Sequence, residues 1–414
     1  MENTVRHTPL EGLRVVELGN YIAAPTAGRM LADFGAEVIK IERPNSGDEL
    51  RRWRLYEGTT SMLFRTINRN KKSVVADLKA PQGRELVLDL IRGADVLIEN
   101  FRPGKLDEWG LGPDVLDAAN PDLVVVRISA FGQTGPMSAM PGFAAVAEAY
   151  GGFRELVGDP DRPPVRVGVS IGDTIAGMHA AYGAMMLLYR RAMDRQAGVG
   201  SRPLSERSVD VALNEATLSV MESLVPDYGA YGVIRTRTGG RMQGAAPSNA
   251  YDCADGRSVV IAGNGNGIFQ RFMTAIDRPD LAEDPDLHDN PGRWERRDEL
   301  DAAIGAWCAQ RPSREVVDLL DGVGVPAGLI FRADDLVADD QLRARGMIQD
   351  MDVSTGEREM SDVPFPGVVP VLDATSEPIR HLGPDLGADT ARVLADVAGW
   401  SEEQVRDYLQ EVHA

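Results

Sequence analysis

A basic segment of the chain has the residue types needed to act on an anionic substrate. Between Lys40 and Lys72 there are nine Lys and Arg residues against four Asp and Glu residues, a net charge of +5. The whole chain of 414 residues has a net charge of −19. In so acidic a chain, a basic segment next to a strand is a candidate phosphate site, although its charges could equally pair with acidic neighbours.

Asp173 lies near the first turn of a long, largely buried helix expected over Gly172–Met193. The backbone N–H groups and the dipole at that end of a helix favour an anion, so a carboxylate there is held ionised. An aspartate in this position could instead be a helix cap that satisfies orphan amides. The residue types leave both interpretations open.

The elements that must position these residues alternate between strand and helix. Apolar runs predict strands at Leu13–Leu18, Glu37–Glu42, Ser73–Leu78, Asp95–Asn100 and Asp122–Ser129. The alternation with helical stretches predicts βαβ units, and runs apolar on both faces predict a mainly parallel sheet covered on both sides. The expected fold class is therefore α/β.

The second half of the chain predicts a smaller domain. Asp194–Ser208 is expected to be an exposed connection, with a hairpin as the alternative, and Val209–Val225 an amphipathic helix. The expected division is a large domain over 1–226, a small α+β domain over 227–329 and a C-terminal part over 330–414 that returns to the large domain.

Composition excludes several classes of protein. Cys253 and Cys308 lack the spacing of a metal site and are expected to be reduced thiols of a cytoplasmic protein. No apolar stretch, Gly183–Tyr189 included, is long enough to span a membrane, and the start of the chain has no apolar signal region. The net charge argues against nucleic-acid binding.

Several motifs in the same order resemble the class III coenzyme A transferases, the family of formyl-CoA and carnitine CoA-transferases. They are Leu10–Glu49, Asn68–Lys79, Glu99–Gly104, Ile128–Pro136 and Gly168–Ala181. The resemblance covers almost the whole chain. It implies a Rossmann-like large domain, a smaller domain, and a homodimer of two chains threaded through each other as interlocked rings.

The same resemblance implies a chemical role for Asp173. Its carboxylate would attack an acyl-CoA thioester to give a mixed anhydride, and the released thiolate would return to give an aspartyl-CoA thioester. A carboxylic acid acceptor would complete the exchange by the reverse steps. The CoA thioester is then a substrate, and no permanently bound cofactor and no metal are expected.

The resemblance also assigns CoA contacts to eight positions. These are Tyr21, Ile22, Ala23, Arg43, Leu78, Lys79, Asn100 and Phe101. Two further CoA-contacting basic positions of formyl-CoA transferase are Glu108 and Pro141 here, and its oxalate-binding positions are Ile22, Leu63 and Phe143-Ala144. Formate and oxalate are therefore poor candidate substrates.

A glycine-rich segment with Gly263, Gly265 and Gly267 follows an expected strand. The pattern is not the dinucleotide fingerprint, so it supports NAD binding only weakly. The resemblance makes it a loop that covers the active carboxylate during turnover, and a plain tight turn is the alternative.

The acceptor is expected to be a short dicarboxylic acid such as succinate, malate, citramalate or mesaconate. Three arginines precede the glycine segment, at Arg235, Arg237 and Arg241, and a bidentate arginine such as Arg241 would recognise a distal carboxylate. All three could instead pair with the acidic surface.

Two other functions stay open from the sequence. One is a 2-methylacyl-CoA racemase or epimerase, but the second base of that family corresponds to Phe143, and His179 is far along the helix from Asp173. The other is a CoA-binding activator or a partner subunit without independent activity.

Overall fold

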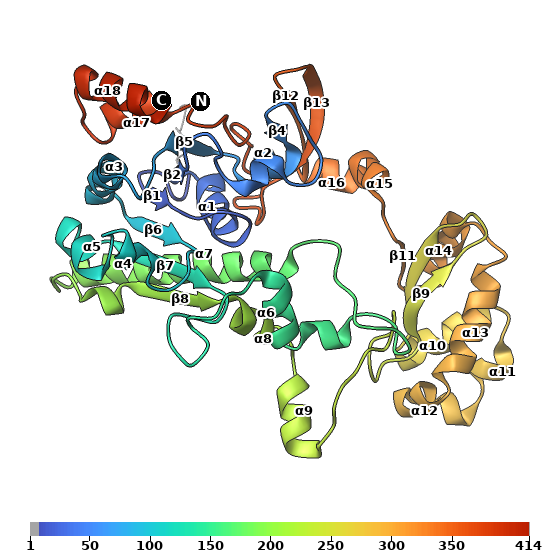
Figure 1. Cartoon of the computed structure of the whole chain (residues 1–414). Coiled ribbons are helices and arrows are strands. Elements are labelled where there is room, and N and C mark those ends of the chain that lie inside the picture. Colours follow the sequence, from blue (N-terminus) through green and yellow to red (C-terminus); the bar gives the residue numbers. More distant parts are fainter. Residues whose placement is uncertain (1–7, 414) are drawn as a thin grey trace. The chain divides into compact units, whose positions relative to one another are not determined.

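A six-stranded parallel sheet organises the larger part of the molecule (Figure 1). The computed structural model describes residues 8–413. The strands are β1 (Arg14–Glu17), β2 (Glu37–Glu42), β5 (Lys71–Val75), β6 (Val96–Glu99), β7 (Val124–Ser129) and β8 (Ser208–Ala212). Their spatial order is β5-β2-β1-β6-β7-β8, and all neighbours run parallel. This is the strand order of a Rossmann-type sheet, so the predicted α/β class with a parallel sheet is confirmed.

Helices cover both faces of this sheet, because successive residues of each strand point to opposite faces and are apolar on both. One core joins Val15, Val38 and Val126 to α1 (Ala23–Asp33), α6 (Ala144–Tyr150), α7 (Ile171–Gln196) and α8 (Leu213–Leu218). The opposite core joins Val16, Ile39 and Val125 to α3 (Pro81–Arg92), α4 (Lys105–Glu108), α5 (Pro113–Ala119), α17 (Thr390–Asp396) and α18 (Glu402–His413).

Two glycines let α7 pack closely against its neighbours. A Cβ atom at Gly177 would lie 2.7 Å from the carbonyl oxygen of Ala23, at the start of α1. A Cβ atom at Gly183 would lie 2.6 Å from a methyl group of Val209 in β8. The start of α7 is therefore fixed next to the start of α1, which follows the carboxyl end of β1.

The predicted helix over Val209–Val225 is wrong, as is the possible hairpin before it. The connection after α7 contains one 3₁₀ turn (Leu204–Glu206) and leads into β8, which runs parallel to β7. The run Ser208–Ala212 alternates polar and apolar residues with period two, the signature of a strand, and only the following residues form α8.

The chain divides into two compact units. Among the described residues, the larger unit comprises 8–153, 168–223 and 340–413, and the smaller unit comprises 154–167 and 224–339. The sequence-based division had placed 154–167 in the large domain and had ended the small domain at 329. The larger unit also contains α2 (Met62–Ile67), α16 (Asp340–Ala344) and two hairpins, β3–β4 (Tyr56–Glu57, Thr60–Ser61) and β12–β13 (Ile348–Ser354, Glu359–Pro366).

The smaller unit has its own sheet and core. Its antiparallel strands are ordered β11-β10-β9, with β9 at Ser248–Asp252, β10 at Ser258–Ala262 and β11 at Ala327–Leu329. Its helices are α9 (Leu224–Tyr231), α10 (Asn266–Ala275), α11 (Pro279–Ala282), α12 (Asn290–Glu295), α13 (Arg297–Cys308), α14 (Ser313–Gly322) and α15 (Ala333–Ala338). Both cysteines are free and buried in this core.

A buried charge network ties the first strands of the large sheet together. The Glu17 carboxylate accepts hydrogen bonds from Lys40 Nζ at 3.0 Å and Lys71 Nζ at 2.8 Å, and all three side chains are almost fully buried. Lys40 also pairs with Asp48 at 2.9 Å. Burial alone would lower the pKa of Lys40, but the carboxylates of Asp48 and Glu17 raise it above its ordinary value.

Replacing Glu17 with alanine is expected to reduce the free energy of unfolding by about 3–5 kcal/mol, because two buried ammonium groups lose their shared carboxylate. Urea unfolding followed by circular dichroism measures the change. Glu85→Ala, on the exposed side of α3, is the matched control and should change stability by less than about 0.5 kcal/mol. Equal effects in the two variants would contradict a structural role for the network.

Candidate active site

A cleft of about 540 Å³ opens at the carboxyl ends of β1, β2, β5 and β6. The strand order reverses between β1 and β6, which is where parallel α/β sheets leave a crevice for ligands. The cleft is lined by Leu18, Asn20, Ile41, Glu42, Arg43, Pro44, Ser46, Ala76, Asp77, Leu78, Lys79, Phe101 and Trp109. Its walls therefore combine apolar side chains with two cations, Arg43 and Lys79, and two carboxylates, Glu42 and Asp77.

The structure brings five of the eight predicted CoA positions to this cleft. Arg43, Leu78, Lys79 and Phe101 line it. Asn100 lies beside it, where its side-chain amide accepts from the Asn20 N–H at 2.9 Å and donates to the Asn20 carbonyl at 2.8 Å. Arg43 and Phe101, almost 60 residues apart in the chain, thus meet because β2 and β6 flank β1 in the parallel sheet.

The other three predicted CoA positions form the turn from β1 into α1. Ile22 and Ala23 are buried, so their side chains pack into the protein and only their backbone could meet a ligand. Tyr21 has φ of +64° and is more exposed. Its ring contacts Trp53 and Phe143, with centroid distances of 5.2 Å and 5.9 Å. An aromatic surface therefore extends from this turn.

The basic segment is not an open positive patch. Seven of its nine cations pair with carboxylates: Lys40, Arg43, Arg51, Arg65, Arg69, Lys71 and Lys72. Among them Arg43 keeps a side chain that is 52% exposed while it pairs with Glu49 at 2.6 Å. The pairing that the sequence left open as an alternative holds for most of the segment, and Arg43 is its cation at the cleft.

Two ionisable groups near the cleft have shifted pKa values. Burial raises the pKa of Glu99, at the end of β6, to about 7, although the Phe101 N–H donates to its carboxylate at 2.7 Å. Burial and the neighbouring Glu49 raise the pKa of Tyr21. Glu99 was missed by sequence reasoning, since a charged residue at a strand end carries no signal of burial.

Asp173 is the third residue of α7 and is partly buried. Ser170 occupies the N-cap position, so Asp173 is not the capping residue. One turn later, Gly177 packs against Ala23 at the start of α1. Asp173 therefore lies towards the carboxyl edge of the sheet, which is also the edge where the cleft opens. The backbone N–H groups of the first turn of α7 surround this position and favour the ionised carboxylate.

Glu148 is a second carboxylate near the start of α7. It is 1% exposed on α6, and its Oε1 accepts from the Gly172 N–H at 3.3 Å. It therefore anchors the backbone directly before Asp173. The sequence analysis missed it, because the approach of α6 to α7 is a tertiary contact.

Phe143 and His179 bear on the racemase alternative. Phe143 precedes α6 and presents a phenyl ring that is 67% exposed and carries no proton to transfer. His179 is exposed, with Nδ1 2.9 Å from the Ile175 carbonyl oxygen and Nε2 3.4 Å from Ser219 Oγ. Six residues along a helix correspond to roughly 600°, so Asp173 and His179 leave α7 on different sides.

The glycine segment of the smaller unit joins β10 to α10. Gly263 packs against the Phe272 ring, and Gly265 precedes the first turn of α10. Arg293 is fully buried and donates to the Asn264 carbonyl at 2.8 Å and to Asn266 Oδ1 at 2.9 Å. These hydrogen bonds hold the glycine segment from the protein interior. Sequence reasoning missed Arg293 for lack of any local signal.

All three arginines before the glycine segment have acidic partners. Arg241 pairs with Asp298 at 2.7 Å and with Asp301 at 2.6 Å. Arg237 pairs with Glu155 at 2.9 Å, and Arg235 lies 4.0 Å from Asp227. The acceptor role expected for Arg241 stays a prediction, and its charge is already matched within the protein.

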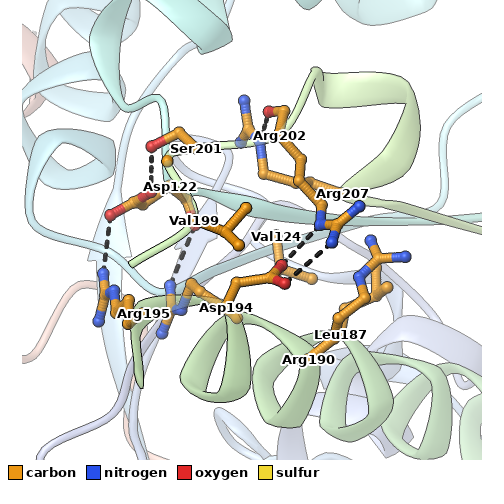
Figure 2. A pocket seen from close by; sticks show the side chains of 12 residues that line it. Asp122, Val124, Leu187, Arg190, Asp194, Arg195, Val199, Ser201, Arg202 and Arg207 are labelled. Carbon is orange, nitrogen blue, oxygen red and sulfur yellow. Dashed lines mark hydrogen bonds and ion pairs between the residues drawn. The ribbon is translucent and has the colours of Figure 1, made fainter. Parts of the chain in front are cut away.

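A second, arginine-rich pocket of about 150 Å³ lies at the amino ends of β7 and β8 (Figure 2). Arg202 forms two bonds to Asp194, and Arg195 and Ser201 both donate to Asp122. These contacts tie the end of α7 to the connection before β8. We interpret them as structural, because cations stabilise the carbonyl end of a helix.

Residues 8–413 contain no group of three or more His, Cys, Asp or Glu side chains placed to hold a metal ion. Within the same range, no helix is long and apolar enough to cross a membrane.

The chain belongs to CoA-transferase family III, whose family description matches residues 10–390. It is similar to the succinyl-CoA–D-citramalate CoA-transferase of Chloroflexus aurantiacus, with 41% identity over 96% of each chain. It is also similar to the beta subunit of a succinyl-CoA–L-malate CoA-transferase of that organism, with 35% identity over 98% of each. A crystal structure of a CAIB/BAIF family protein from Brucella suis superposes with a TM-score of 0.82 at 32% identity, covering 95% of this chain and 100% of that one. The protein is therefore a CoA transferase.

Arg43→Ala is expected to raise the apparent KM for every acyl-CoA by about ten- to a hundredfold, because a charge-assisted phosphate contact is lost. Acceptor preference should not change. Steady-state kinetics with two donors and two acceptors measure both effects. Arg92→Ala, in the last turn of α3 and outside the cleft lining, is the control. Unaltered CoA kinetics in Arg43→Ala would leave Arg43 a surface charge.

Proposed function

We propose that the enzyme moves CoA between an acyl-CoA thioester and a short dicarboxylic acid. The observation that carries this proposal is the position of Asp173 in the first turn of α7, at the same edge of the sheet as the cleft with the predicted CoA residues. The similar Chloroflexus enzymes, named as succinyl-CoA–D-citramalate and succinyl-CoA–L-malate CoA-transferases, support the substrate class.

The proposed reaction uses Asp173 as the nucleophile. Its carboxylate attacks the thioester carbonyl, the C–S bond breaks, and a mixed anhydride and CoA thiolate result. The thiolate then attacks the aspartyl carbonyl of the anhydride, releasing the donor carboxylate and leaving an aspartyl-CoA thioester. The acceptor carboxylate attacks the aspartyl carbonyl of that thioester, the C–S bond breaks, and a second mixed anhydride forms. The released thiolate then attacks the acceptor carbonyl of this anhydride, which gives the acceptor CoA thioester and regenerates Asp173.

A carboxylate suits this chemistry because each intermediate keeps the activated acyl bond. The anhydride and the thioester are close in energy, so transfer costs little provided that water is excluded. The Phe143 ring and the neighbouring Tyr21 and Trp53 rings supply an apolar surface next to the turn into α1. The Gly263–Gly267 segment is proposed as the loop that covers the carboxylate, and a cytoplasmic location stays a prediction.

We also propose that the protein is a homodimer of interlocked chains. One face of α7 carries a row of exposed apolar side chains: Met178, Tyr182, Met186, Tyr189 and Met193. Such a continuous stripe on a helix that is buried on its other side is typical of a contact between proteins. A heteromeric assembly is the alternative, since one similar enzyme is named as a beta subunit.

Asp173→Ala is expected to abolish CoA exchange while the protein stays folded, because its side chain supplies the covalent bond. Exchange of labelled CoA between succinyl-CoA and malate measures the activity, and thermal unfolding measures the fold. Wild-type enzyme incubated with acyl-CoA should lose activity to hydroxylamine, with the modification on Asp173 by mass spectrometry. Turnover by the variant, or rapid α-deuteration of a 2-methylacyl-CoA without transfer, would refute the proposal.

Placing two charges on the stripe, as in Tyr182→Glu with Met186→Glu, is expected to prevent two chains from assembling as they fold, so that the purified protein is monomeric. Light scattering after gel filtration measures the mass of the purified protein. Gln82→Glu, on the exposed side of α3, is the control and should leave the mass unchanged. A charged variant that keeps the dimer mass would place the interface elsewhere.

A further inference from the structure

A carboxylate from another helix reaches the turn of α7 that carries Asp173. It belongs to Glu148 of α6, whose Oε1 accepts a hydrogen bond from the Gly172 N–H at 3.3 Å. Both helices are part of the larger unit, so this contact lies within one compact body. Glu148 thus holds the backbone directly before the proposed nucleophile.

The first turn of α7 takes its cap from outside the helix. The first N–H groups of a helix have no acceptor within it, and a Ser or Thr at the N-cap position usually supplies one. Ser170 occupies the N-cap position of α7, but its side chain makes no capping hydrogen bond. Its carbonyl oxygen accepts from the Thr174 N–H at 3.0 Å and from Thr174 Oγ1 at 2.8 Å. The carboxylate of Glu148 therefore does at Gly172 what a capping side chain does in other helices.

The absence of a side chain at Gly172 lets this carboxylate approach. A Cβ atom at position 172 would lie 2.9 Å from Glu148 Cγ and 3.2 Å from Glu148 Oε1, so a larger residue would push the carboxylate away. Glu148 is 1% exposed, and a carboxylate so deeply buried needs hydrogen bonds to offset its loss of hydration. The Gly172 N–H supplies one of them, and the dipole of α7 stabilises a negative charge at this end of the helix.

α6 packs against α7 and α8, which makes it a firm support for Glu148 (Figure 1). Ala144 and Ala147 of α6 are buried in the core that this helix shares with α7. Directly after α6, a Cβ atom at Gly151 would lie 2.8 Å from Thr217 Cβ, so the end of α6 is in close contact with α8. The carboxylate is thus presented to α7 from a helix whose own position is fixed by packing.

We infer that Glu148 is a positioning residue for the carboxylate of Asp173. The inference rests on the proposed function and names a residue of α6 that acts on the reaction through the Gly172 backbone. By holding the N–H of the preceding residue, Glu148 restricts the first turn of α7, so that the Asp173 carboxylate attacks the thioester from one orientation. A displacement of about 1 Å can cost on the order of a hundredfold in rate, because the attack requires aligned reacting atoms. Such a residue affects kcat more than the affinity for CoA, since Glu148 is not among the residues that line the cleft with the predicted CoA contacts.

Glu148→Ala is expected to lower kcat by about ten- to a hundredfold and to change the KM for acyl-CoA by less than about twofold. Glu148→Gln keeps an oxygen that can accept the Gly172 N–H, so its kcat should return to within about threefold of the wild-type value. Steady-state kinetics with succinyl-CoA and malate measure both constants. Rapid-quench mass spectrometry of the Asp173 adduct measures the rate of the covalent step, which should fall in Glu148→Ala.

Gly172→Ala tests the same contact from the other side. The added methyl group takes the space next to Glu148 Cγ and displaces the carboxylate, so kcat should fall as it does in Glu148→Ala. The double variant should lose little more than either single variant, because both changes remove one contact.

Two control variants separate this role from a general loss of packing. Gly200→Ala is the control for the added methyl group, since a Cβ atom at Gly200 would have no neighbour within 4 Å among the described residues. Glu377→Gln is the control for the loss of a buried carboxylate, since Glu377 of the larger unit is 3% exposed. Both controls should keep the wild-type kcat.

The inference and the proposed function fail in different ways. If folded Glu148→Ala, judged by thermal unfolding, keeps the wild-type kcat, or if Glu148→Gln is impaired as strongly as Glu148→Ala, the inference is overturned while CoA transfer through Asp173 stands. Should Glu148→Ala fail to fold, a wild-type kcat in Gly172→Ala overturns the inference in the same way. If wild-type protein forms no adduct at Asp173 and Asp173→Ala keeps turnover, the proposed function is overturned and the inference falls with it.

Discussion

The shared carboxylate of Glu17 constrains the turn from β1 into α1 and ties it to β2 and β5. It holds Lys40 of β2 and Lys71 of β5, and Lys71 also donates to the Pro25 carbonyl of α1 at 2.7 Å. Lys40 in turn holds Asp48, whose side chain accepts the Tyr21 N–H at 3.1 Å. The turn into α1 and the loop that carries Arg43 are therefore fixed by one buried network, because a buried charge must keep its partners.

That network explains why a strongly acidic protein keeps an exposed cation beside this cleft. Most cations of the basic segment form ion pairs within the protein. Arg43 stays at the cleft because its partner Glu49 belongs to the same short loop. Neither the net charge of the chain nor the local charge of the segment predicts how many cations are exposed at the cleft. What matters is which cations the fold leaves in contact with solvent beside the strand ends.

The sequence predicted the parts of the fold that local patterns encode. Apolar runs marked five strands of the large sheet, and the start of α7 was placed within one residue. β8 was missed because Val209 and Val211 alternate over only five residues before a helical pattern begins. Arg43 and Phe101, which the resemblance assigns to CoA contacts, line one cleft, whereas Glu148 and Arg293 act through tertiary contacts that no local pattern reports.

Local patterns also fail to report the partners of Arg241, the arginine that the sequence predicts as the contact of the acceptor carboxylate. Arg241 stands out in the sequence because it lies in a basic run before the glycine segment, while Arg297 lies among Asp298, Glu299 and other charges and looks neutralised. In the folded unit the order reverses, since Asp298 reaches Arg241 and Glu299 reaches Arg296. A substrate carboxylate gains most from a cation that has no internal partner to displace, because breaking a partly buried pair costs as much as the new contact returns. Which arginines of the smaller unit are already paired with a carboxylate is thus determined by the folded unit and not by the local abundance of arginine.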